Sequence, residues 1–133
     1  MSEFEVLKEF KKNLISFFDE LIDIFPKEGD LVIVRIFLKD QMPIEDVLSK
    51  FINSINKDDN KIRKMIKEKN EIFFLENNIF EHSVSTTKVL HFKKLWRSGI
   101  LDDEDKKQLW RWCDSFIYLA DKYVKIKNSD KPI

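Results

Sequence analysis

The sequence predicts an all-α protein folded as a single compact domain of about six helices, with long first and last helices. Apolar residues recur at spacings of three and four along most of the 133 residues, which places their side chains on one face of an α-helix. Capping residues stand where these periodic segments begin. No internal repeat, low-complexity tract or linker divides the chain, and a chain of this length suits one core.

The first predicted helix begins at Ser2, which forms a capping box with Glu5. Pro26 disfavours helical geometry at the residue before it, so we expect this helix to end near Phe25. Its core face carries six apolar residues at helical spacing: Leu7, Phe10, Leu14, Phe17, Leu21 and Ile24.

The segment LVIVRIFLKDQ (31–41) allows two interpretations. Its β-branched residues favour a strand, but a strand needs a partner, and EIFFLE (71–76) is the only other candidate. Because the flanking segments are helical, we expect residues 31–40 to form a buried helix capped by Asp30.

Three elements are predicted in the middle of the chain. A helix starts at Pro43, where a missing amide costs nothing, and a short helix capped by Asp58 or Asp59 follows it. Residues 70–83 have no clean period and predict a turn of helix with an ordered connection. The apolar residues of these elements are Ile44, Val47, Leu48, Phe51, Ile52 and Ile55, then Ile62, Met65 and Ile66, then Phe73, Phe74 and Phe80.

Residues 86–126 predict a helical hairpin. Its first helix ends at Gly99, which can take the left-handed conformation, and we expect Ile100 to fold back onto Leu95. Asp102 opens the last helix. Basic residues at the end of the first helix and acidic residues at the start of the second suit the two helix dipoles.

Composition limits the class of protein. The predicted domain covers residues 1–126, and residues 127–133 lack apolar periodicity, which predicts a frayed tail. The 24 basic and 24 acidic residues give zero net charge, so there is no global attraction to nucleic acid or anionic membranes. The longest apolar run, LVIV (31–34), is too short for a membrane span. With one cysteine and no secretory signal at the start, the sequence predicts an intracellular protein without an internal disulfide.

Few residues offer catalytic or metal chemistry. His82, His91 and Cys113 are the only nitrogen or sulfur ligands, and no two have metal-ligand spacing. Cys113 lies on the apolar face of the last predicted helix, which indicates a buried thiol rather than a nucleophile. Two glycines cannot build a phosphate-binding loop. We therefore predict a non-enzymatic protein with no metal, cofactor or small-molecule substrate.

The stretch HFKKLWRSGILDDEDKKQLWRW (91–112) interleaves tryptophans with basic residues. This pattern occurs in stacking platforms for nucleic acids, but two packed helices also explain it. On a 3.6-residue period Trp96 faces the core, whereas Lys93, Lys94 and Arg97 face mainly elsewhere. These three bases are the candidate contacts for an alternative function as an accessory nucleic-acid-binding protein, which we rank below helix packing.

Trp110 and Tyr118 point away from the main apolar face of the last predicted helix. Aromatic residues usually fill cores, which favours packing of these two against the first helix. The alternative is an exposed patch that binds another protein. Trp110 and Tyr118 are therefore the candidate protein-contact residues, and a homodimer built on an exposed aromatic face is a further hypothesis.

Two stretches, FFDELIDIFPKEGDLVIVRIFLKDQMPIEDVLSKFI (17–52) and HFKKLWRSGILDDEDKKQLWRWCDSFIYLADKY (91–123), resemble small uncharacterised helical proteins of nucleocytoplasmic large (giant) DNA viruses. The resemblance covers about half of the chain and carries no catalytic or binding motif. It implies a viral protein of the host cytoplasm or the virion. The expected function is a non-enzymatic interaction or structural module in assembly, the virion or host-factor engagement, with a protein partner (self, virion or host).

Overall fold

The computed structural model describes residues 2–76 and 86–129, and over these residues the all-α prediction is confirmed. This part of the chain forms seven α-helices and one 3-10 turn, without a strand. The helix beyond the expected six is the six-residue α5, and Phe80 of the predicted connection lies outside the described residues. The bounds are α1 (Glu3–Ile24), α2 (Gly29–Asp40), α3 (Ile44–Asn56), η1 (Asp58–Asn60), α4 (Lys61–Glu68), α5 (Glu71–Glu76), α6 (Thr86–Arg97) and α7 (Asp103–Ser129).

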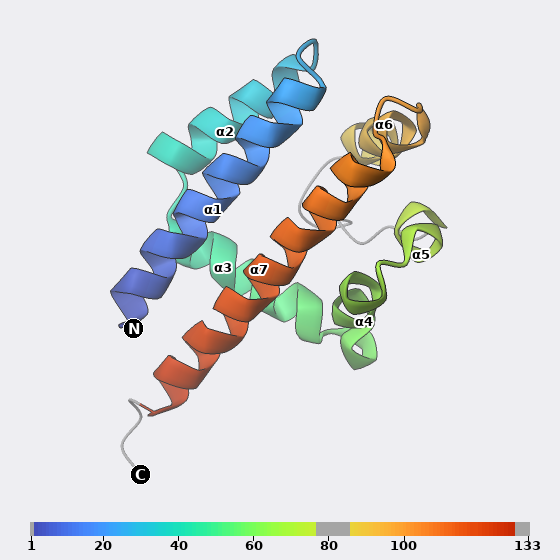
Figure 1. Ribbon diagram of the computed structural model, residues 1–133. Coiled ribbons are helices and arrows are strands. Elements are labelled where there is room, and N and C mark those ends of the chain that lie inside the picture. The colour runs from blue at the N-terminus through green and yellow to red at the C-terminus, as the bar shows by residue number, and fades with distance from the viewer. Residues whose placement is uncertain (1, 77–85, 130–133) are drawn as a thin grey trace.

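The two long helices organise the fold. α1 and α7 run antiparallel and pack together, and α1 lies between α7 and α2 (Figure 1). α3 crosses behind this pair and contacts both helices, while α4 packs on α3 and α7. α5 and α6 lie near the start of α7 (Figure 1). α2 therefore stands at the edge of the molecule, with α1 as its main neighbour.

Two apolar clusters fill the interior, and Phe17 packs against both. The first joins the start of α1 to α3 and the end of α7, and contains Val6, Phe10, Leu48, Ile55, Phe116, Leu119, Ala120 and Tyr123. The second joins the end of α1 to α4, α5, α6 and the start of α7, and contains Leu21, Phe25, Met65, Ile66, Phe74, Trp96, Leu101, Leu109 and Trp110.

The caps of the two long helices agree with the sequence. The hydroxyl of Ser2 accepts a hydrogen bond from the amide of Glu5 at 3.1 Å. At the start of α7 the carboxylate of Asp102 accepts a bond from the amide of Asp105 at 2.7 Å, and the amide of Asp102 donates to Asp105 in return. Each cap satisfies an amide of the first turn that the helix itself leaves unpaired.

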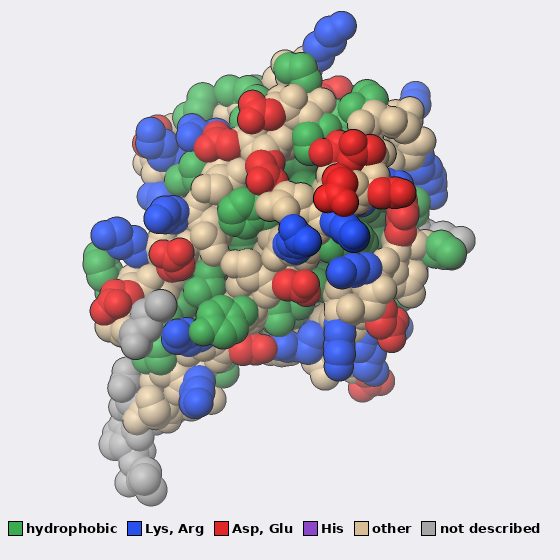
Figure 2. All heavy atoms as spheres, in the orientation of Figure 1, with side chains coloured by type: hydrophobic (Ala, Val, Ile, Leu, Met, Phe, Trp, Pro, Cys, Tyr) green, Lys and Arg blue, Asp and Glu red, His purple; other side chains and the backbone are tan. Residues whose placement is uncertain are grey.

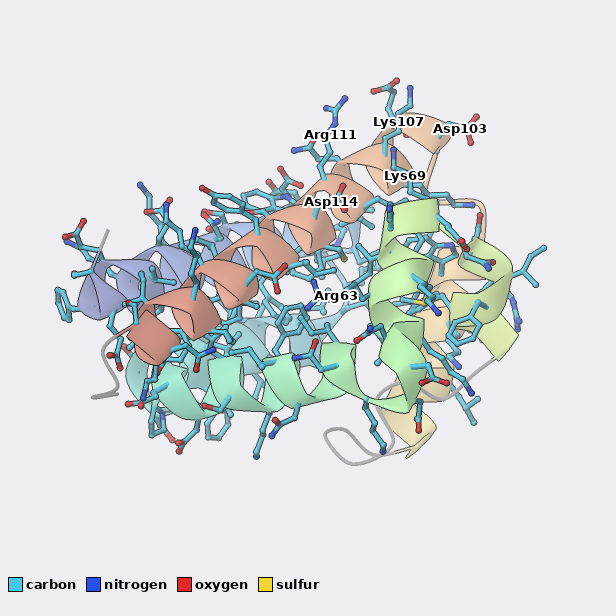
Figure 3. The ribbon with its side chains drawn as sticks, turned by 90° about the horizontal axis from the view of Figure 1, so that it is seen from below. Arg63, Lys69, Asp103, Lys107, Arg111 and Asp114 are labelled. Carbon is cyan, nitrogen blue, oxygen red and sulfur yellow. The ribbon has the colours of Figure 1, made fainter. Side chains whose placement is uncertain are left out.

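The helical hairpin predicted over 86–126 is present as two helices joined by a turn, and Gly99 has the expected positive φ of 83°. Leu101 is 5% exposed and Ile100 is 55% exposed, so Leu101 is the residue that packs in the core at this turn. α6 and α7 meet at the turn and cross at a steep angle there (Figures 1 and 3).

Two expected helix caps need correction. Residues 31–40 are helical, but α2 starts at Gly29 with Glu28 as N-cap and without a side-chain capping bond, so Asp30 is not its cap. Asp58 and Asp59 do not cap α4, because with Asn60 they form a turn with φ of 51°, 59° and 62°, a conformation that Asp and Asn tolerate.

α7 also continues beyond residue 126, through Ser129. Lys127 lies 3.3 Å from a carboxylate oxygen of Glu3 and 3.5 Å from one of Glu45, which ties the end of α7 to α1 and α3. The frayed tail predicted for 127–133 was therefore wrong for its first three residues, and residues 130–133 lie outside the description. Among the described helices, none combines the length and apolarity that crossing a membrane requires.

Candidate functional site

α2 rests on α1 through one narrow face. Leu38 is buried at 6% exposure, and Leu31 and Arg35 are partly buried. These residues are spaced at four and three, so they lie on one side of the helix. The guanidinium of Arg35 donates to the carboxylate of Asp19 on α1, with 2.6 Å between Nε and Oδ1. Packing and an ion pair thus fix which side of α2 faces inward.

The opposite side of α2 is apolar and open to solvent. Val32, Ile33, Ile36 and Phe37 are between 41% and 53% exposed, and we call these four residues the α2 stripe. Their spacing makes them neighbours on one helical face. Apolar side chains line the upper-left edge of the molecule in Figure 2, where Figure 1 places α2. The expectation that residues 31–40 form a buried helix was therefore wrong, although the helix itself is present.

An uncovered stripe of this kind is unusual for a surface helix. A helix that covers one side of a core normally carries polar residues on the other side, and a helix that is apolar all round is normally buried. Exposed apolar area costs about 25 cal/mol per Å² relative to burial. Contiguous apolar patches rimmed by polar residues often mark binding surfaces. The α2 stripe is the main candidate surface in this structure.

The two predicted protein-contact residues lie in different environments. Trp110 is 7% exposed and packs edge-on against Trp96, with 5.8 Å between ring centroids. It belongs to the core, so its assignment as a contact residue was wrong, and the packing alternative holds for it. Tyr118 is 61% exposed, with the ammonium of Lys122 5.3 Å from its ring centroid. The two residues therefore do not form a common patch.

The three bases of the nucleic-acid alternative do not form one surface. Lys93 is buried at 7% exposure, so its expected outward orientation was wrong, whereas Lys94 and Arg97 are exposed. Burial lowers the pKa of Lys93, and the positive charge of Arg97 lowers it further. Burial of Trp96 on the same helix agrees with the sequence.

A different basic region lies between α4 and α7. A shallow cavity of about 460 Å³ is lined by Arg63, Lys67, Lys69, Asp114 and Ile117 (Figure 3). Arg63 is already engaged, because its guanidinium makes bonds of 2.8 and 2.9 Å to the carboxylate of Asp121. Lys67 and Lys69 are exposed at the rim, and an acid of α7, Asp114, lines the same cavity. The surface is therefore mixed in charge.

Cys113 and His91, the two candidate side chains that the structure describes, are engaged in packing or pairing. Burial, and next the charge of Asp114, raises the pKa of the Cys113 thiol to about 12, so the thiol is protonated at neutral pH. The ring of His91 lies 2.8 Å from the carboxylate of Glu28. His82 lies outside the described residues. Within the described ranges, no group of three or more His, Cys, Asp or Glu side chains is arranged to hold a metal ion.

Sequence reasoning missed the α2 stripe because it assigned the apolar run to the core. A signal was available in the LVIVRIFL segment, where apolar residues occupy every side of the helix. Such a helix has a second apolar face after one face has packed. No protein-family model matches the sequence, and no curated protein or solved structure shows significant similarity to it.

Proposed function

We propose that this chain is a non-enzymatic helical interaction module that docks another protein through the α2 stripe. The observation that carries the proposal is the exposure of four neighbouring apolar side chains on a helix held firmly by its other side. A fixed helix with an apolar outer face provides a preformed surface, so little ordering entropy is lost when a partner binds.

We further propose a viral setting, with a role in assembly, the virion or engagement of a host factor. This part of the proposal is supported by the resemblance of residues 17–52 and 91–123 to giant-virus proteins. The first of these stretches contains the whole α2 stripe. The protein would then act in the host cytoplasm or in the particle.

The test is recovery of partners from cells that produce the tagged chain. The variant Ile33→Glu/Phe37→Glu places two charges on the α2 stripe, and Glu is a good helix former, so the helix is kept. Ile72→Glu is the matched control, because Ile72 is 68% exposed on α5, away from α2 (Figure 1). We expect proteins recovered with the wild type and with the control to be lost with the α2 variant. Recovery of the same proteins by all three chains would refute the proposal.

A second candidate function is accessory binding of nucleic acid, supported by Lys67 and Lys69 at the rim of the α4–α7 cavity. Phosphate contacts are strongest at low salt, so binding of single- and double-stranded DNA and RNA should be measured at about 50 mM salt. Lys67→Glu/Lys69→Glu removes these bases, and Lys94→Glu/Arg97→Glu tests the original candidates. Absence of binding by the wild type at low salt excludes this function.

A further inference from the structure

We draw no further inference here: the strongest candidate, the exposed apolar α2 stripe at the edge of the helical fold, identifies no occupant, because acidic and basic side chains flank it alike and nothing in the structure shows what covers it.

Discussion

The indole of Trp96 donates a hydrogen bond to the carboxylate of Glu71, with 2.6 Å between Nε1 and Oε1. The ammonium of Lys106 binds the same oxygen at 2.8 Å and lies 5.9 Å from the centroid of the Trp96 ring. One carboxylate thus joins α5, α6 and α7. The hydrogen bond from Lys106 is the largest cause that lowers the pKa of Glu71, and the bond from Trp96 contributes in the same direction.

Glu71→Gln should destabilise the fold at neutral pH, and its effect should diminish in acid. Because the pKa of Glu71 is lower in the folded protein than its ordinary 4.5, the carboxylate stabilises the fold above that pH and loses this contribution as pH falls through the folded-state pKa. Urea unfolding at a series of pH values gives the difference in free energy of unfolding. Glu104→Gln, at an 82% exposed position, is the control. A difference independent of pH would contradict the assignment.

Phe116→Ala should lower the free energy of unfolding by about 3–5 kcal/mol, the range for a buried phenylalanine. The Phe116 ring is 6% exposed and contacts those of Phe10 and Phe17 with centroids 5.7 and 5.5 Å apart. Tyr118 lies two residues further along, on the exposed side of α7. Tyr118→Ala should therefore change the free energy of unfolding by less than about 0.5 kcal/mol. Denaturant unfolding of both variants checks the contrast, and equal effects would show that α7 is oriented differently.

The stability of the protein should fall as pH rises from about 9 toward 12, in part because of Cys113. The pKa of its thiol rises from 9.0 to about 12 on folding, so the unfolded chain releases this proton at lower pH than the folded protein. Above the unfolded value the folded state must retain the proton, and stability decreases. Cys113→Ala should reduce the slope of stability against pH in this window. An unchanged slope would show that the thiol titrates normally.

The backbone amides of α2 should exchange hydrogen faster than those of α7 in dilute solution. α2 packs mainly on α1, whereas Leu119 and Ala120 of α7 are almost completely buried, and segments with few packed neighbours open locally at lower cost. Equal protection of both helices in dilute samples would argue against the edge position of α2.

The parts of the fold that were predicted correctly depend on local physics. Ser2, Gly99 and Asp102 mark helix ends through hydrogen bonds and dihedral angles within a few residues, and such signals are present in the sequence. Periodicity also placed Trp96 in the core correctly. These features can be predicted without knowing how the helices are arranged in space.

The errors concern which face of a helix is covered. Residues 31–38 include a single charged residue, Arg35, so no polar face indicated the solvent side, and only the position of α2 at the edge reveals it. Lys93 was expected outside and is buried. The pairing of Glu71 with Trp96 and Lys106 joins residues 25 and 35 positions apart, and sequence spacing cannot show such contacts.

The packing of α1 against α7 has a consequence for synthesis on the ribosome. Val6 and Phe10 complete their cluster only with residues such as Phe116 and Tyr123, and the side chain of Asn13 bonds to Ser115, 102 positions later. At typical translation rates this interval takes roughly 5–20 s. During that time the apolar face of the first helix emerges without its partner. The nascent chain therefore completes its fold only when the last helix has left the exit tunnel, and until then it is a candidate client for chaperones.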